Sequence, residues 1–209
     1  MENATGEARR VLMDALGRLS DCTDELGKLD AELGDGDLGI TVSSGARAAI
    51  EAIAALPGEA GPAEMVKAAG KAFGGANPST FAALIHGASI SAAAVIRSEE
   101  RLDPRTGEAM LRAATESIAR RGKAELGDKT VLDPMTASLE ALRTANAHGA
   151  EPLIPMIEAA RLETERLTAH RSRKGRAAWV GERSAGRTDG GSVAYIRFLE
   201  FLRDAIAAR

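Results

Sequence analysis

The stretch "ARRVLMDALGRLSDCTDELGKL" (residues 8–29) decides the fold class. Charged residues such as Arg18 and Asp21 separate apolar residues that recur at steps of three and four, namely Val11, Leu12, Ala15, Leu16, Leu19, Cys22, Leu26 and Leu29. This period places the apolar side chains on one face of an α-helix. The sequence therefore predicts one long amphipathic helix over residues 8–29, with Cys22 as a small buried residue on it.

Helical periodicity continues along the rest of the chain, and convincing alternating β segments are absent. Turn motifs such as "GGANPS", "DPRTG" and "AHGAEP" separate the periodic segments. Helices are predicted over residues 40–56, 63–73, 80–99, 107–120, 133–147, 152–170 and 192–208. We therefore predict an all-α protein of seven or eight helices, forming a single domain over residues 1–209.

The composition is that of a globular protein, with 44% hydrophobic and 27% charged residues among 209. Only 3% of residues are aromatic, so the core is expected to be aliphatic. A net charge of −3 gives no electrostatic reason to expect nucleic acid as a partner. No apolar run approaches the length of a membrane span, and "MENATGEARR" does not resemble a signal peptide. We expect a cytoplasmic protein that binds neither nucleic acid nor membrane.

The segment "LDAELGDGDLGIT" (residues 29–41) concentrates acidic residues and glycines. Asp30, Asp35 and Asp37 would repel one another unless a cation lies between them. Mg²⁺ takes oxygen ligands and commonly bridges one or two carboxylates to substrate phosphates. The glycines would let the backbone turn tightly enough to aim the carboxylates at one point. The segment is either a magnesium site or a solvated acidic turn, and the residues alone leave both open.

Three familiar motifs are excluded. Residues 34–39 satisfy G-x-G-x-x-G, but a predicted helix precedes them where a dinucleotide-binding fold has a strand. "GKAELGDKT" (residues 122–130) has the glycine spacing of a P-loop, but Asp128 interrupts the required Gly-Lys-Thr. An EF-hand that starts at Asp35 would need a glutamate at its twelfth position, which is Ala46.

Two other segments favour a phosphate ligand. "FGGANPST" (residues 73–80) leads into a helix whose N-terminus could bind an anion. "RSRKGRAAWVGERSAGRTDGG" (residues 171–191) loses helical periodicity over a length unusual for a loop. It is either disordered or an ordered, ligand-covering loop, and the apolar residues 177–180, which include the only tryptophan, favour the second. This loop would offer phosphate the charges of Lys174, Arg176 and Arg183.

The histidines give no site. His86 lies on an apolar predicted helix, and His148 and His170 lie at predicted helix ends. All three are interpreted as structural residues.

Four motifs, in this order and spacing, resemble the nucleotide-binding L subunit of bacterial dihydroxyacetone kinases. They are "LDAELGDGDLGIT", "GGANPSTF", "RGKAELGDKTVLDPM" and "KGRAAWVGERSAGRTDGG". The resemblance covers the chain from about residue 27 to the last predicted helix. It implies a barrel of eight antiparallel amphipathic helices that binds ATP or ADP with two Mg²⁺ ions at one end.

The resemblance also implies roles for particular residues. Asp30, Asp35 and Asp37 would hold the metal ions, and Arg176 would be the catalytic residue of a flap over the nucleotide. The other nucleotide-binding residues would be Leu38, Gly39, Ile40, Thr41, Ala76, Asn77, Gly122, Val131 and Asp189. The chain differs from the common family pattern at Asn77 and at Val131.

L subunits of this family do not bind the sugar. The ketose attaches to a histidine of a separate K subunit, and no room for such a domain follows the last predicted helix. The expected partner is therefore a K-type subunit, and the expected assembly is a homodimer or a heterocomplex. "GDGDLGIT" is nearer to the ATP-using branch than to the branch that retains ADP for rephosphorylation by a phosphotransferase multidomain protein. A regulatory nucleotide-binding module is the competing function class, and the phosphorylated ketose is left open.

Overall fold

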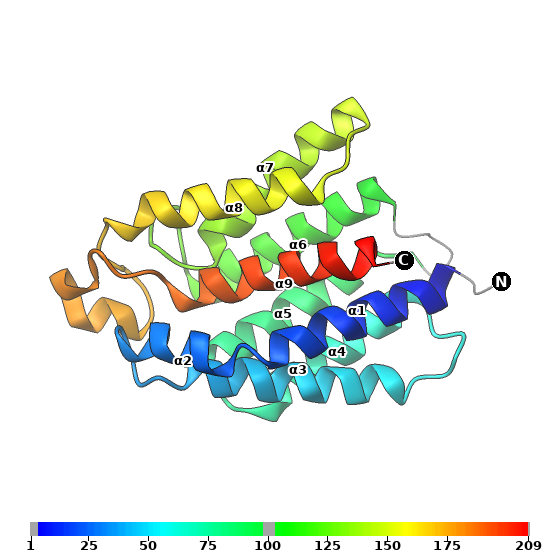
Figure 1. Ribbon diagram of the computed structural model, residues 1–209, viewed down its shortest axis with the longest axis horizontal. Helices are drawn as coiled ribbons and strands as arrows, with labels where there is room; N and C mark the ends of the chain where they lie inside the picture. Colours follow the sequence, from blue (N-terminus) through cyan, green and yellow to red (C-terminus); the bar gives the residue numbers. More distant parts are fainter. Residues whose placement is uncertain (1–3, 98–102, 209) are drawn as a thin grey trace.

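The computed structural model describes residues 4–97 and 103–208, and within them every regular element is helical (Figure 1). The α-helices are α1 (Ala4–Ser20), α2 (Thr23–Ala31), α3 (Leu38–Ala54), α4 (Pro62–Ala76), α5 (Thr80–Ala93), α6 (Pro104–Gly122), α7 (Leu132–His148), α8 (Leu153–Thr168) and α9 (Gly190–Ala207). A 3₁₀ segment, η1 (Arg176–Ser184), lies between α8 and α9. The predicted all-α class is confirmed.

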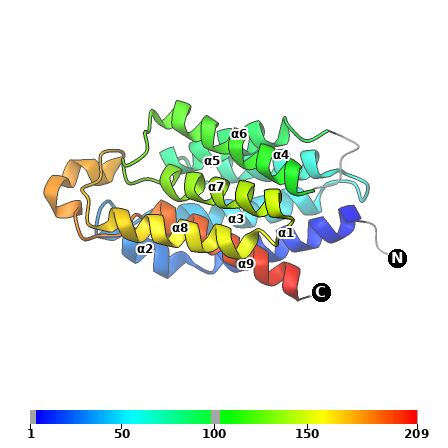
Figure 2. The same ribbon diagram turned by 90° about the horizontal axis from the view of Figure 1, so that it is seen from above.

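The helices form a closed ring. From α3 to α9, each α-helix packs against the next in the chain, and α1 closes the ring by packing against both α3 and α9. From α3 to α9, successive α-helices run in opposite directions, and α1 begins at the same end of the molecule where α9 ends (Figures 1 and 2). This is the antiparallel barrel of about eight helices that the resemblance implies, with α2 as an addition beside α3 and α9.

The predicted helix over residues 8–29 is wrong in one respect, because it is two helices. At the junction, Asp21 N donates to Arg18 O at 3.2 Å and Cys22 N donates to Leu19 O at 3.1 Å, which are the short-range bonds of a tightened last turn. Cys22 therefore lies at the junction, half-buried, rather than within a helix. The break lets α2 turn onto the start of α3, where the two backbones are in contact.

Most other predicted boundaries agree within two or three residues. The exception is the helix predicted over residues 80–99, because α5 ends at Ala93 and turns follow to residue 96. Residues 98 and 99 of that prediction lie outside the described residues. The face that α5 buries in the core consists of small residues and ends at Ala93, and the next two residues are exposed.

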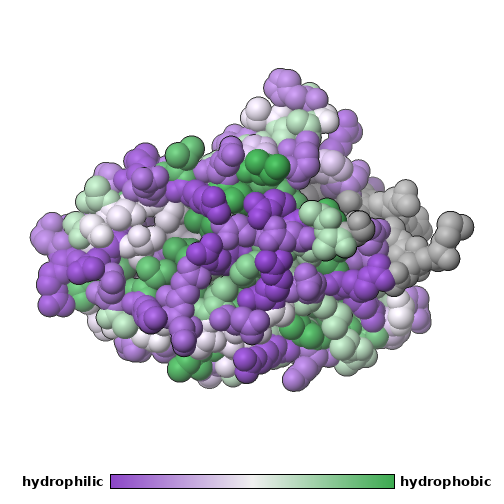
Figure 3. All heavy atoms as spheres, viewed as in Figure 1, coloured by the Kyte–Doolittle hydropathy of each residue, from purple (hydrophilic) through white to green (hydrophobic). Residues whose placement is uncertain are grey.

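The core is aliphatic, as the composition predicts. The largest fully buried apolar side chains include Leu26, Ile53, Met65 and Ile118. Four phenylalanines contribute to one core cluster, namely Phe73, Phe81, Phe198 and Phe201. Charged and apolar residues alternate over the surface, and the face in Figure 3 is mostly hydrophilic with scattered apolar residues. Over the described residues, no helix is both long and apolar enough to cross a membrane.

Candidate nucleotide and metal site

The three predicted metal ligands meet in the loop between α2 and α3. One carboxylate oxygen from each of Asp30, Asp35 and Asp37 lies within 4.8 Å of the others. Asp30 and Asp37 are half-buried, and Asp35 is exposed. Clustered carboxylate oxygens are the hard donors that Mg²⁺ prefers, so the donor set fits this ion.

Short-range geometry holds this loop in place. Gly36 has φ +77°, a backbone conformation that L side chains rarely adopt. A Cβ atom at Gly34 would lie 3.0 Å from Asp30 Oδ1, so a side chain there would press on the carboxylate. Asp30 Oδ2 accepts a hydrogen bond from Leu38 N at 3.3 Å, which joins the cluster to the first turn of α3. The glycines thus have the role that the sequence predicted.

The acidic loop lies at the end of the barrel where many helices begin. Because successive helices run in opposite directions, α3, α5, α7 and α9 all start at this end (Figures 1 and 2). The first amides of a helix and its dipole favour anions. The predicted phosphate-binding residues 38–41 form the first turn of α3, and Ala76 and Asn77 end α4 beside it. Asn77 Nδ2 donates to the buried Thr41 Oγ1 at 2.9 Å, so the structure brings these two predicted positions together.

The flap, defined here as residues 171–189, is ordered and lies over the acidic loop. Arg176 Nη1 forms an ion pair with Asp35 and lies 3.3 Å from Asp37 Oδ2. Arg187 Nη1 lies 3.2 Å from Glu32 Oε2, a second link that the sequence did not indicate. The structure therefore brings Arg176 together with the predicted metal ligands, although the two segments are far apart in the chain.

The reason given for an ordered flap, apolar residues 177–180 that can be buried, holds only in part. Ala177, Ala178 and Val180 are half-buried, but Trp179 is 87% exposed. Polar contacts at the base of the flap also hold it. Ser184, which is fully buried, accepts a hydrogen bond from Ser172 N at 2.8 Å, and Gly186 N donates to Thr168 O at 2.8 Å.

Lys129 is the residue of this region that the motif search missed. It lies in the failed P-loop match and in the resemblance motif "RGKAELGDKTVLDPM", neither of which gave it a role, yet it is 3% exposed and has φ +63°. Burial lowers the pKa of its amine, and the Asp189 carboxylate opposes that shift. Its neighbour Asp128 is also buried, and Asp128 O accepts a hydrogen bond from Arg173 N of the flap at 3.0 Å.

The remaining predicted residues lie at the same end of the barrel and are bound to neighbours outside the three aspartates. Gly122 ends α6, and Val131, which is 5% exposed, packs in a core cluster with Leu84. Asp189 caps α9, where its Oδ2 accepts bonds from Ser192 N at 2.7 Å and Ser192 Oγ at 2.8 Å. Burial raises the pKa of Asp189 and the bonds from Ser192 lower it, with a net rise. The nucleotide contacts of these three residues stay predictions.

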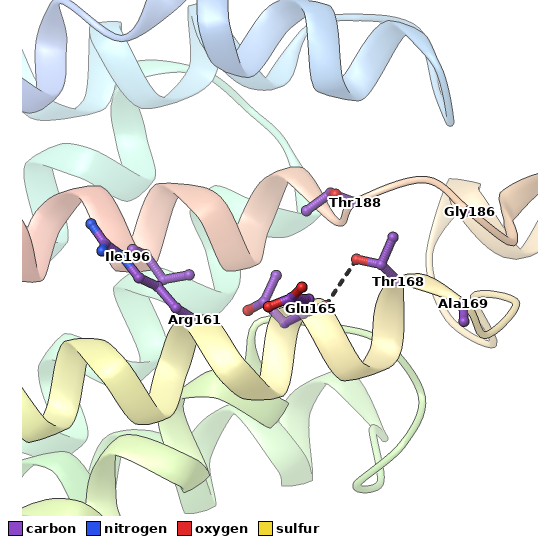
Figure 4. Close-up of a pocket in the computed structure, with 8 residues that line it drawn as sticks. Arg161, Glu165, Thr168, Ala169, Gly186, Thr188 and Ile196 are labelled. Atoms are coloured by element: carbon purple, nitrogen blue, oxygen red, sulfur yellow. Dashed lines mark hydrogen bonds between the residues drawn. The ribbon is translucent and has the colours of Figure 1, made fainter.

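A groove of about 550 Å³ lies between α8 and α9 (Figure 4). Arg161, Glu165 and Thr168 of α8 face Ile196 of α9 across it, and Gly186 and Thr188 of the flap close one end. No residue of the acidic cluster lines this groove. The predicted site beneath the flap is therefore separate from this groove.

Comparison with known proteins gives a match to the family described as the DAK2 domain, over residues 32–204. The chain is 33% identical over 180 residues to an L-erythrulose 1-kinase of Mycolicibacterium smegmatis, covering 85% of this chain and 32% of that protein. It is 28% identical over 188 residues to the ADP-binding subunit DhaL of the PEP-dependent dihydroxyacetone kinase of Escherichia coli, covering 87% of this chain and 86% of that subunit. The chain thus spans about a third of the erythrulose kinase but most of the subunit.

Solved structures share the fold. The dihydroxyacetone kinase of C. freundii superposes with a TM-score of 0.74 at 21% identity, covering 98% of this chain and 35% of that one. Its complex with AMP-PNP and Mg²⁺ gives a TM-score of 0.75 at 22% identity, covering 98% and 34%. At this identity the likeness shows the fold alone, but the family match covers most of the chain. The protein therefore belongs to the DAK2-domain family, whose members include ADP-binding DhaL subunits.

Proposed function

We propose that this chain is the nucleotide-binding subunit of a two-subunit kinase that transfers a phosphoryl group from ATP to a short ketose. The ketose, dihydroxyacetone or a relative such as erythrulose, would lie on a separate K-type subunit. The convergence of Asp30, Asp35 and Asp37 beneath Arg176, at the first turn of α3, carries this proposal. The names of the relatives, which are ketose kinases or their ADP-binding subunits, support it.

Each part of the site has a role in this proposal. The carboxylates of Asp30, Asp35 and Asp37 hold two Mg²⁺ ions, which neutralise phosphate charge when bound. The amides of Gly39 and Ile40 and the dipole of α3 bind phosphate oxygens. Arg176 leaves the carboxylates and donates its forked hydrogen bonds to phosphate, where it stabilises charge in the transition state.

Two alternatives use the same site. In the first, the chain keeps ADP bound and a phosphoenolpyruvate-dependent phosphotransferase protein rephosphorylates it. The coverage of the PEP-dependent DhaL subunits of E. coli and Listeria innocua, 86% of each, favours this relay. In the second, the chain is a regulatory nucleotide-binding module without turnover. The motif "GDGDLGIT" favours the ATP-using form.

Calorimetry and a coupled assay test the proposal. The isolated chain is expected to bind ATP or ADP only when Mg²⁺ is present and to phosphorylate neither dihydroxyacetone nor erythrulose. Phosphorylation is expected once the K-type subunit of the same organism is added with ATP. Turnover by the isolated chain would contradict the division of labour, and failure to bind either Mg²⁺–nucleotide would contradict the site itself. Tightly bound ADP together with turnover that requires a phosphotransferase protein would replace the ATP-using form with the relay.

A further inference from the structure

All three hydrogen-bond donors of the Lys129 ammonium group bind carbonyls at the base of the flap, which comprises residues 168–172 and 184–186. Its Nζ donates to Ser184 O at 2.7 Å, to His170 O at 2.8 Å and to Thr168 O at 3.1 Å. An ammonium group has three hydrogens, so these three carbonyls satisfy it completely. No carboxylate of the described residues lies within ion-pair distance of Lys129. Its hydrogen bonds therefore go to the backbone alone, and the Asp189 carboxylate favours the charge from a greater distance.

Two of the three carbonyls come directly before the flap, and the third lies near its other end. Thr168 and His170 lie where α8 ends and the flap begins, and Ser184 lies where η1 ends. Lys129 therefore joins the segment that leads into the flap to the segment that follows η1. Ser184 Oγ, which accepts from Ser172 N at 2.8 Å and donates to Gly181 O at 2.6 Å, closes the base beside it.

The loop that carries Lys129 is itself held by the barrel. Val131 packs in the core cluster that includes Ile118 and Met135. The buried Asp133 accepts hydrogen bonds from Gly127 N at 2.6 Å and Thr130 N at 2.8 Å, so both sides of Lys129 are held. Rigid contacts thus run from the barrel core through Lys129 to the flap.

The far part of the flap has few such contacts. Trp179 is 87% exposed, and the Arg176 side chain is about half exposed where it meets Asp35 and Asp37. A loop whose outer contacts are exposed can place a long side chain reproducibly only if its base is rigid. A buried ammonium is costly, and it persists where its hydrogen bonds are complete.

We propose that Lys129 is a positioning residue that fixes the base of the flap and thereby holds Arg176 over the acidic cluster. Lys129 does not touch the nucleotide; it acts through Arg176. This inference rests on the proposed function, since Arg176 acts on the phosphates in that proposal.

The first test needs no nucleotide. Lys129→Met removes the charge and keeps the length of the side chain, and Lys71→Met, at an exposed position of α4, is the matched control. Because the flap is rich in arginine, trypsin is expected to cut Lys129→Met within residues 171–187 at least roughly tenfold faster than the wild type, with the helical melt retained. The anisotropy of Trp179, the only tryptophan, is expected to fall in the same variant. Equal cleavage rates and equal anisotropy in a folded Lys129→Met protein would overturn the proposal.

The second test shows whether Lys129 acts through Arg176. Lys129→Met and Arg176→Ala should each weaken Mg²⁺–ADP binding by roughly tenfold, and the double variant should be no weaker than Arg176→Ala alone. Lys129→Arg should recover part of the loss, because it keeps the charge but not the compact geometry. Additive losses would overturn the proposal. If the wild type binds no nucleotide, the proposed function fails, while the proteolysis result still decides the role of Lys129.

Lys129→Met can fail to fold, since it leaves three carbonyls without a donor. Ser184→Ala then provides the same tests, because it removes the bonds to Ser172 and Gly181 without a change of charge. Faster cleavage of the flap and a loss of binding that is non-additive with Arg176→Ala would support the role of the base. Wild-type behaviour of Ser184→Ala in both tests would overturn it.

Discussion

At the residue scale, Arg176 occupies the position that the sequence analysis assigns to a cation. Its guanidinium pairs with Asp35 and approaches Asp37 to 3.3 Å. The repulsion among the carboxylates is therefore partly compensated without metal. Both members of the Arg176–Asp35 pair are about half exposed, and exposed pairs contribute little to stability. The stability of the protein should depend more on ligand than on this pair.

Asp35→Asn tests the metal site through stability. Mg²⁺ and ADP together are expected to raise the wild-type melting midpoint by about 5–10 °C, because a ligand at a hundredfold excess over its Kd stabilises the native state by about 2.7 kcal/mol. Neither component should do so alone. Asp35→Asn should abolish the shift and change the midpoint of the ligand-free protein by less than about 2 °C, since it removes both a repulsion and an ion pair.

The matched control is Asp24→Asn, an exposed aspartate of α2 outside the cluster, which should keep the full shift. The measurement is a thermal melt of each protein with each ligand, with both ligands and with a chelator. A shift that persists in Asp35→Asn, or with the chelator, would return residues 29–41 to the interpretation of a solvated acidic turn.

At the element scale, the contact between α2 and α3 decides where the acidic loop lies. A Cβ atom at Gly39 would overlap the carbonyl oxygen of Thr23 and lie 2.8 Å from Gly27 N. Only a residue without a side chain lets the first turn of α3 approach the backbone of α2 this closely. This approach also requires α2 to be separate from α1, which explains the break at residues 21–22.

Gly39→Ala is therefore expected to destabilise the protein, although alanine is the better helix former. Overpacking against a backbone that cannot move aside should cost about 1–3 kcal/mol and lower the melting midpoint by roughly 3–10 °C. Gly107→Ala is the control, because Gly107 lies in α6 with open space where its Cβ would be. It should stabilise by up to about 1 kcal/mol. Thermal melts of both variants measure the difference, and stabilisation by Gly39→Ala would contradict the close approach.

At the scale of the whole molecule, an ion-pair network joins helices on one side of the ring. Arg197 of α9 donates to Glu25 of α2 at 2.5 Å and to Glu200 at 2.7 Å. Arg161 of α8 also donates to Glu200, which is only 8% exposed. Burial alone would raise the pKa of Glu200, but hydrogen bonds from Arg197 and Arg161 outweigh it and lower that pKa below the ordinary 4.5. Through these two arginines, Glu200 connects α8 and α9 with α2, which lies at the other end of the sequence.

Glu200→Gln is expected to reduce the free energy of unfolding by about 2 kcal/mol at pH 7. Because the folded pKa is below the unfolded one, the contribution of Glu200 is complete above 4.5 and is lost as the pH falls through the folded pKa. The two proteins should therefore converge in stability in strongly acidic solution. Urea unfolding at a series of pH values measures this, with Glu140→Gln on the exposed face of α7 as the control. A difference that does not change with pH would contradict the network.

Local patterns in the sequence predicted most of the fold. Seven of the eight predicted helices appear as single helices. The spacing of apolar residues and the turn residues that end a helix are both local signals, so they can be recognised in the sequence. The break in the first helix was missed because its cause, the approach of Gly39 to Thr23, joins residues of different elements. The apolar residues of the flap explain its order only in part, because Trp179 is exposed. The base of the flap is held by Lys129, which lies 39 to 55 residues from the carbonyls it binds.

The helical class, the aliphatic core and the grouping of three aspartates in one glycine-rich loop follow from residues close together in the chain, so they can be predicted from it. Three features required the folded molecule: the ring closes through α1 and α9, four helices begin at the same end as the aspartates, and Arg176 reaches Asp37 from 139 positions away. Such long-range contacts depend on how several faces pack at once and on the conformational entropy lost when distant segments meet. No local pattern encodes that balance, and the complete site exists only once the barrel has closed.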